Sequence, residues 1–332
     1  MSANAQADDV RFGVQLPLWD YNVHPEVSFP VIRDTALLAE ELGYDFVSLD
    51  DHLMRGEGGV FYESWTTVSM LAALTSRVRF QHSVLCNMYR PPALLAKMAA
   101  TLDAAAGGRY ELGIGAGWKR EEAEAYGLPW AETKERMDRL EEALQVIRAL
   151  WTEDVAHFTG RYYTLGGAVC APKPAQRPHP PIWVGGGGEK RTLRIAARYA
   201  TGANFAAPGI GSGAGMDVFS YFEHKKGVLF AHCREVGRDP SELTLSAGVN
   251  LMLWGRDRDE VRRRLEAAAS QRGLSGPERE RLLAGMQHAI QSVEQCIDHV
   301  RRFIALGARS ISVTRASPEA MRRFAEEVIP SL

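Results

Sequence analysis

Short apolar runs alternate with helical segments along this chain, and this alternation restricts the folds that it can adopt. Eight runs have the length and composition of β-strands: residues 10–16, 45–49, 78–85, 110–114, 182–184, 202–205, 243–253 and 310–314. Apolar strands joined by helices are typical of a parallel sheet that helices cover. Eight of them favour an α/β fold of the (β/α)8 TIM barrel type over an open doubly wound sheet.

Two additions to the barrel are predicted. Residues 153–180 form an insertion between strands 4 and 5 and contain a hairpin at residues 157–163. Extra helices precede strand 8, because residues 258–287 and 293–306 are helical in pattern. Since no composition shift or internal repeat marks a second domain, we expect a single domain over residues 1–332.

The charge and cysteine content exclude several classes of function. The chain has 39 Lys and Arg against 41 Asp and Glu, and a net charge of -2 gives no electrostatic reason to expect nucleic acid or a membrane as a partner. A signal peptide and a membrane-spanning run are both lacking, so we expect a cytoplasmic protein. The four cysteines are scattered without a CxxC pair, which predicts neither a metal site nor a disulfide framework.

Polar, aromatic and glycine residues follow several of the predicted strands. In a barrel the carboxyl ends of the strands share one face, where barrel enzymes have their active sites. The residues expected to converge there are Trp19, Asp51, His52, Cys86, Asn87, Gly115, Ala116, Gly117, Gly185, Gly186, Gly187 and Gly188.

Two groups of glycines indicate a bound cofactor. Gly113, Gly115 and Gly117 occupy alternate positions, which is typical of a strand whose backbone is closely approached, here by a cofactor ring. An equally good interpretation is a junction where glycine only eases the turn. Residues 185–188 precede a helix, so their N–H groups can hold a phosphate, although they lack the dinucleotide GxGxxG pattern. The alternative there is a flexible loop.

His52 follows two aspartates at the end of a strand and has three interpretations. It can be a neutral core histidine, a metal ligand without a second histidine at ligand spacing, or a proton-transfer group that Asp51 or Asp50 tunes. We favour the third. Trp118 is consistent with a core aromatic, and Glu122 with a favourable charge at a helix start. No motif of serine hydrolases, zinc proteases or Walker-type nucleotidases occurs.

Several longer motifs occur together in a characteristic order. They are FGVQLP near the start, DDH at a strand end, YRPPALLAKMAATLD before GGRYELGIGAGW, ERMDRLEEALQVIRALW, GRYYTLGGA and PPIWVGGGGEKRTLRIAARYA. With this set, over residues 10–205, the chain resembles the luciferase-like monooxygenase superfamily, specifically its branch of coenzyme F420-dependent oxidoreductases.

The resemblance implies a barrel, commonly dimeric, with the cofactor ring in its mouth and the phosphate at residues 186–188. It implies a cis peptide bond between Ser83 and Val84, which together with Asn87 would contact the cofactor. It assigns His52 as the ring-facing, catalytic histidine with Asp51 as its catalytic neighbour.

The chain also departs from the family's glucose-6-phosphate dehydrogenases. Those enzymes have glutamate where this chain has Trp118, and tryptophan where it has Gly56. We therefore expect an apolar or aromatic substrate in a pocket that includes Trp19, Trp118 and Cys86.

The function expected from the resemblance is hydride transfer between C5 of coenzyme F420 and a small organic substrate, with reduction of a C=C or C=N bond. One alternative is an FMN-dependent monooxygenase that receives reduced flavin from a partner reductase. A second alternative is a flavin- or deazaflavin-binding protein without turnover.

Overall fold

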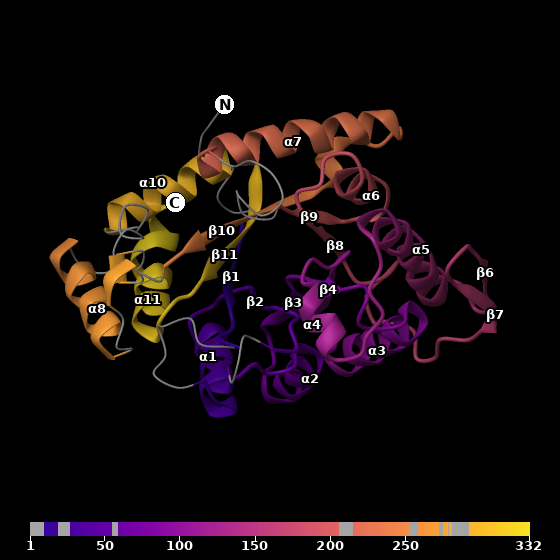
Figure 1. Cartoon of the computed structure of the whole chain (residues 1–332), viewed down its shortest axis with the longest axis horizontal. Coiled ribbons are helices and arrows are strands. Elements are labelled where there is room, and N and C mark those ends of the chain that lie inside the picture. The colour runs from indigo at the N-terminus through magenta and orange to yellow at the C-terminus, as the bar shows by residue number, and fades with distance from the viewer. Residues whose placement is uncertain are drawn as a thin grey trace. The chain divides into compact units, whose positions relative to one another are not determined.

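The computed structural model confirms the predicted (β/α)8 barrel and its order of strands along the chain (Figure 1). It describes residues 10–18, 27–54, 59–205, 215–251, 258–271, 275–277, 279–280 and 292–332. The eight predicted strands appear as β1 (Arg11–Gln15), β2 (Phe46–Leu49), β3 (Arg79–His82) with β4 (Leu85–Cys86), β5 (Tyr110–Gly115), β8 (Ile182–Gly185), β9 (Gly202–Asn204), β10 (Thr244–Asn250) and β11 (Ala308–Thr314).

The helices begin where the sequence provides start signals. Proline occupies the first turn of α3 (Pro92–Ala105). Asp217 and Ser292 accept hydrogen bonds from backbone N–H groups in the first turns of α7 (Val218–Glu235) and α10 (Val293–Ala305). No helix in the described ranges has the length and apolar character needed to cross a membrane. The helices are α1 (Phe29–Glu41), α2 (Ser64–Leu74), α3 (Pro92–Ala105), α4 (Arg120–Ala125), α5 (Thr133–Thr152), α6 (Thr192–Tyr199), α7 (Val218–Glu235), α8 (Arg258–Gln271), α10 (Val293–Ala305) and α11 (Pro318–Arg323).

The chain forms two compact units. The first contains residues up to 47 and from 247 onward. In it β1 and β11 are parallel neighbours, paired from Arg11 with Ser310 to Val14 with Val313. The C-terminal segment packs against β1, since the rings of Phe12 and Phe324 meet edge to face with centroids 5.9 Å apart, and the Tyr44 hydroxyl donates to the Met321 carbonyl at 2.8 Å. The extra helices α8 and α10 lie before β11 in sequence, as predicted.

The second unit, residues 48–246, contains β3, β4, β5, β8 and β9. Its parallel pairs run from β3 through β5, β8 and β9 to the start of β10, and β4 continues alongside β5 beyond the end of β3. Helices α3 and α5 lie side by side in this unit (Figure 1), where the Trp151 indole N–H donates to the Ala96 carbonyl at 2.9 Å. Trp151 is therefore a core residue.

The insertion between β5 and β8 contains the hairpin predicted at residues 157–163. Its strands are β6 (Ala156–Thr159) and β7 (Thr164–Ala168), so the hairpin extends beyond the predicted range at its second strand. The Glu142 carboxylate accepts the backbone N–H groups of Arg161, Tyr162 and Tyr163, which fixes the turn. The sequence did not indicate β7, because its TLGGA segment has little intrinsic preference for a strand.

Candidate active site

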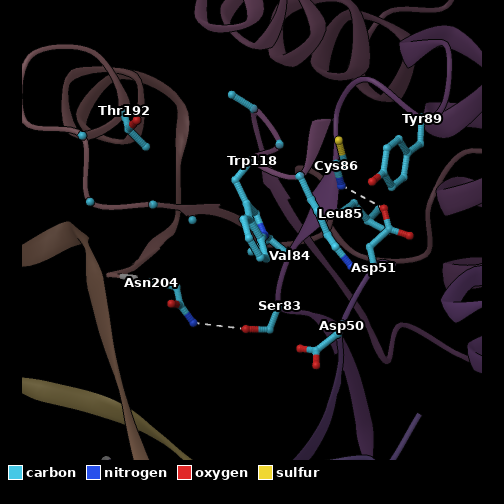
Figure 2. Close-up of a pocket in the computed structure, with 18 of the residues that line it drawn as sticks. Asp50, Asp51, Ser83, Val84, Leu85, Cys86, Tyr89, Trp118, Thr192 and Asn204 are labelled. Atoms are coloured by element: carbon cyan, nitrogen blue, oxygen red, sulfur yellow. Dashed lines mark hydrogen bonds between the residues drawn. The ribbon is translucent and has the colours of Figure 1, made fainter. Parts of the chain in front are cut away.

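A pocket of about 370 Å³ opens in the second unit at the carboxyl ends of β2, β4, β5, β8 and β9 (Figure 2). Most of the residues singled out in the sequence line it: Asp51, His52, Ser83, Val84, Cys86, Gly115, Ala116, Gly117, Trp118, Gly185, Gly186, Gly187 and Gly188. Asn87 does not; its side chain is buried beside the pocket and only 2% exposed. Trp19 lies outside the described residues. A pocket of this size suits part of a cofactor or a small substrate.

Val84, at the wall of the pocket, fills the space next to three glycines, Gly113, Gly115 and Gly185. The Ser83–Val84 peptide bond is cis, as predicted. A Cβ atom at Gly185 would lie 2.7 Å from Val84 Cγ1, and one at Gly115 would lie 3.1 Å from Val84 Cγ2. A Cβ at Gly113 would lie 1.7 Å from the carbonyl oxygen of the residue before Ser83 and 3.1 Å from Val84 Cγ1. The expectation that these glycines leave room for a cofactor ring is therefore corrected: the chain itself occupies that space.

Gly117 is required by a neighbouring thiol. Its φ of 81° lies in the left-handed region, and a Cβ would lie 2.5 Å from the Cys86 Sγ. Cys86 pairs with Gly115 across β4 and β5, and the backbone N–H of Asn87 donates to the Gly115 carbonyl at 2.9 Å. Burial raises the pKa of the Cys86 thiol to about 12, so this side chain is a neutral wall of the pocket and not a nucleophile.

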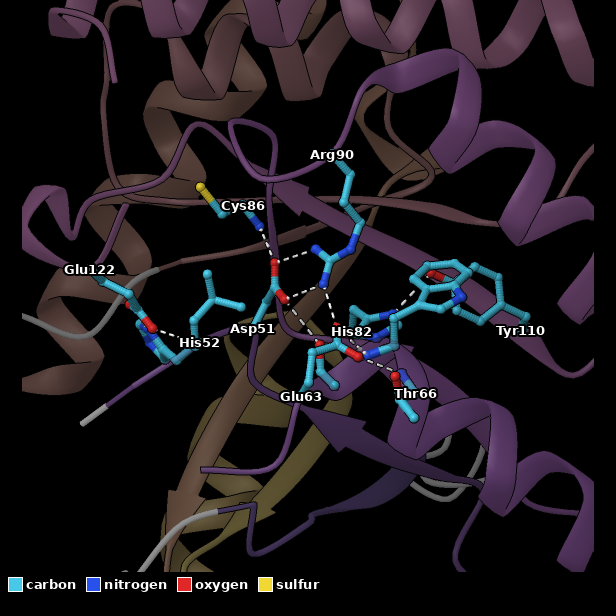
Figure 3. A network of polar contacts seen from close by, with 12 residues as sticks. Asp51, His52, Glu63, Thr66, His82, Cys86, Arg90, Tyr110 and Glu122 are labelled. Atoms are coloured by element: carbon cyan, nitrogen blue, oxygen red, sulfur yellow. Dashed lines mark hydrogen bonds and ion pairs between the residues drawn. The ribbon is translucent and has the colours of Figure 1, made fainter. Parts of the chain in front are cut away.

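The carboxylate that contacts His52 is Glu122 (Figure 3), which corrects the expectation that Asp51 or Asp50 tunes this histidine. His52 Nδ1 lies 2.7 Å from Glu122 Oε2. The other oxygen of Glu122 accepts the backbone N–H groups of Leu53 and Met54. Burial alone would raise the pKa of Glu122, but the hydrogen bonds from His52 and these two N–H groups lower it to about 2.

This pairing fixes the tautomer of His52. An ionised carboxylate only accepts hydrogen bonds, so Nδ1 carries a proton and Nε2 is the nitrogen through which His52 can exchange one. This role of Glu122 was not predicted, because no local sequence signal marks it. In the structure Glu122 and Ala123 form the buried face of α4, whereas Glu121 and Glu124 are exposed.

Asp51 joins three segments of the second unit around the pocket. Its carboxylate accepts two hydrogen bonds from the Arg90 guanidinium, at 2.9 and 3.0 Å, and one from the backbone N–H of Cys86 at 2.8 Å (Figure 3). The Ser64 hydroxyl, at the start of α2, donates to it at 3.0 Å. Arg90 also donates to Glu63 at 2.6 Å. Asp51 thus connects the end of β2 to β4 and α2, and Arg90 is a second residue that the sequence analysis missed.

Aromatic side chains surround His52 at the edge of the pocket. The rings of Phe61 and Trp118 meet the His52 ring edge to face, with centroids 5.6 and 5.7 Å away. Trp118 is 66% exposed, so it is not the core aromatic that its residue type allowed. Lys119, beside it, donates to the Met54 carbonyl at 3.1 Å. An exposed indole beside an imidazole offers an apolar face to a bound molecule.

The glycine loop, residues 185–188, is shaped by contacts on both sides. Gly186 has a φ of 132°, and a Cβ at Gly188 would lie 2.7 Å from the Thr192 hydroxyl oxygen at the start of α6. The backbone N–H of Gly186 donates to the Asn204 carbonyl at 3.0 Å, and the Asn204 amide donates to the Ser83 hydroxyl at 3.1 Å (Figure 2). Glycines have no Cβ, so an anion can approach the backbone N–H groups of this loop, which precedes a helix.

Three side chains of helix α7 form hydrogen bonds with Glu189, the residue that follows this loop. Glu189 accepts hydrogen bonds from Lys225 Nζ at 2.6 Å and His224 Nε2 at 2.9 Å. The carbonyl of Glu189 accepts a third from His232 Nε2 at 2.8 Å. Lys225 is only 1% exposed, so its charge requires this partner.

Comparison with known proteins identifies relatives for most of the chain. The model of the luciferase-like monooxygenase family matches residues 14–327. An F420-dependent glucose-6-phosphate dehydrogenase of Amycolatopsis mediterranei (strain U-32) is 36% identical over 192 residues, which are 56% of this chain and 54% of the relative. An FMNH(2)-dependent dimethylsulfone monooxygenase of Pseudomonas putida is 34% identical over 176 residues, 52% of this chain and 48% of the relative. The chain thus matches only about half the length of these relatives.

Solved structures share the fold over nearly the whole chain. An F420-dependent secondary alcohol dehydrogenase in complex with an F420-acetone adduct has a TM-score of 0.77 at 23% identity, covering 97% of this chain and 98% of that one. The coenzyme F420-dependent tetrahydromethanopterin reductase of Methanopyrus kandleri has a TM-score of 0.75 at 19% identity, covering 97% and 99%.

Proposed function

The chain belongs to the luciferase-like monooxygenase family, and from this premise we propose that it is a coenzyme F420-dependent oxidoreductase. Its reaction is hydride transfer between C5 of the deazaflavin and a small apolar or aromatic substrate, in the direction that reduces a C=C or C=N bond. The observation that carries the proposal is the position of His52, which an ionised Glu122 holds at the wall of a pocket that also contains the glycine loop.

The residues of the pocket fit a planar cofactor with a phosphate-bearing chain. Ser83, Val84 and Gly115 line the same pocket as the glycine loop. A Cβ at Gly188 would clash with the Thr192 hydroxyl oxygen, so glycine at this position leaves space for an anion beside the loop. When bound, the deazaflavin supplies a carbon that accepts or donates a hydride.

The chain's own residues then have distinct tasks. His52 holds or moves a proton at Nε2, because Nδ1 is committed to Glu122. Asp51 and Arg90 keep β2 and β4 in place around the bound molecules. Trp118 covers the substrate and reduces the access of water.

The apolar class of substrate is supported by what surrounds His52. Trp118 stands where the resemblance gives glutamate in the glucose-6-phosphate dehydrogenases, so a carboxylate that could act on a sugar hydroxyl is replaced by an indole. The Phe61 ring also meets the His52 ring edge to face. The Trp118 indole, which lines the pocket, offers an apolar face to a flat substrate.

A direct titration with each cofactor tests the proposal. The purified protein is titrated with F420 and, separately, with FMN in oxidised and reduced form, and ligand fluorescence is followed. We expect F420 to bind at least about tenfold more tightly than FMN, a difference of about 1.4 kcal/mol. Tight binding of reduced FMN without binding of F420 would refute the assignment. It would favour the FMN-dependent monooxygenase, which the similarity to the dimethylsulfone enzyme also supports.

Two variants then separate a catalyst from a binding protein. We expect His52→Gln to lower the rate of reduction of an accepted aromatic enone or imine while F420 affinity changes little. The matched control is Glu121→Gln, an exposed neighbour of Glu122 on α4. Equal rates for His52→Gln, the control and the natural chain would exclude His52 from proton transfer and favour a protein that only binds its cofactor.

A further inference from the structure

Two adjoining hollows form a groove in the second unit, away from the pocket described above. One has a volume of about 480 Å³ and the other about 520 Å³, and Arg198 and Arg238 line both. The groove lies where β8 and β9 begin, since Pro181 and Thr201 line it and directly precede these strands. The active-site pocket lies where the same two strands end, so the groove is not an extension of that pocket.

Arginine dominates the groove. Five arginines line it against two glutamates, which leaves an excess of three positive charges: Arg148, Arg177, Arg194, Arg198 and Arg238 against Glu235 and Glu242. The whole chain, by contrast, has a net charge of -2. A concentration of positive charge in a concave surface attracts anions more strongly than scattered charges do.

Three of these arginines have no carboxylate partner among the residues that the structure describes. They are Arg148, Arg177 and Arg194. The other two are committed: Arg198 donates to Glu141 at 2.7 Å, and Arg238 donates to Glu242 at 3.1 Å. The glutamates of the groove are likewise engaged, since Glu235 contacts His232 at 3.1 Å. Arg177 donates instead to the carbonyls of Pro174 and Gln176, so the charges of Arg148 and Arg194 are the most accessible to a ligand.

The geometry points to a second binding site in this groove, for a compact anion that carries two or more phosphate or carboxylate groups. The planar guanidinium group of arginine binds both chemistries through paired hydrogen bonds. Tyr199 and Thr201 also line the groove, and their hydroxyl groups can donate further hydrogen bonds.

Helix α6 connects this groove to the active-site pocket. Thr192, its first residue, lines the pocket and contacts the glycine loop, whereas Arg194 and Arg198 line the groove. An anion held by these arginines would therefore rest on the helix that supports the glycine loop. The site is additional to the proposed oxidoreductase function and does not depend on it.

Calorimetric titration at low ionic strength tests the site, with pyrophosphate and citrate as separate probes of phosphate and carboxylate chemistry. We expect saturable binding of at least one of them, weakened at least about tenfold in Arg148→Gln/Arg194→Gln. Both side chains are exposed and unpaired by carboxylates, so folding should be unaffected, which thermal unfolding checks. The control Arg161→Gln/Arg322→Gln changes the net charge equally at exposed positions outside the groove and should bind as the natural chain does.

Three results would overturn the inference. They are the absence of saturable binding of either anion, equal weakening in the groove variant and the control, and unchanged binding in the groove variant. The last result would assign the anion to the glycine loop instead. A failure of F420 to bind would refute the proposed oxidoreductase but leave this comparison between variants intact.

Discussion

Replacement of Glu122 by glutamine removes one buried charge while keeping the size of the side chain. In the natural chain this carboxylate accepts hydrogen bonds from His52 and from the backbone N–H groups of Leu53 and Met54, and its side chain is fully buried. Glutamine can still accept at its carbonyl oxygen, but its amide group faces a donor. We therefore expect Glu122→Gln to destabilise the folded chain and to release His52 from its fixed orientation.

The magnitude follows from the pKa of the carboxylate. This pKa falls from 4.5 to about 2 on folding. Each tenfold change in proton affinity corresponds to about 1.4 kcal/mol, so the ionised form gains about 3 kcal/mol in the folded state. Because the folded-state pKa is depressed, this stabilisation is complete above the unfolded pKa and is lost as the pH falls towards 2. At about pH 3 roughly 1.4 kcal/mol should remain.

Urea unfolding of the natural chain and of Glu122→Gln measures this difference. The variant should be less stable by about 2–3 kcal/mol near neutral pH, and the gap should shrink to about half near pH 3. Glu121→Gln, one residue away and exposed, should change stability by less than about 0.5 kcal/mol at either pH. A gap for Glu122→Gln that is below about 0.5 kcal/mol, or that does not vary with pH, would refute the reasoning.

Three further outcomes are expected. Gly113→Ala should cost at least about 3 kcal/mol of unfolding free energy or prevent folding, because its Cβ would lie 1.7 Å from a backbone oxygen. Gly227→Ala, within α7 where a Cβ meets nothing within 4 Å, should instead stabilise the chain by about 0.5–1 kcal/mol in the same urea assay. Glu189→Gln should speed hydrogen exchange of the glycine loop, measured by mass spectrometry, because the charged hydrogen bond from the buried Lys225 is weakened. The exposed Glu223→Gln should not, and equal exchange in both would contradict the role of Glu189.

Much of the fold was predictable because its determinants are local. The apolar runs matched β1, β2, β5 and β8 closely, since buried parallel strands are apolar on both faces. The cis bond between Ser83 and Val84 was implied only by the family resemblance, and the single strand predicted over residues 78–85 is divided there into β3 and β4. The second strand of the hairpin, β7, was not predicted, because its TLGGA segment has little intrinsic preference for a strand.

The site was predictable to the extent that it follows strand ends. That rule brought His52, Cys86 and Gly117 to one pocket, whereas Trp118 was assigned to it through the family resemblance. It failed for the partner of His52, because Glu122 reaches the site from a helix and looks, in sequence, like an ordinary charge near a helix start. Long-range pairs of this kind depend on the tertiary fold, and local sequence patterns do not encode them.

The fit of Val84 against Gly113, Gly115 and Gly185 has a consequence for protein engineering. At Gly185 a larger residue requires a smaller one in place of Val84, whereas at Gly113 a backbone oxygen also blocks any side chain. Val84, Gly115 and Gly185 line the active-site pocket. A designer who wishes to exchange the cofactor or substrate should therefore leave these four residues intact and vary the rim, beginning with Trp118.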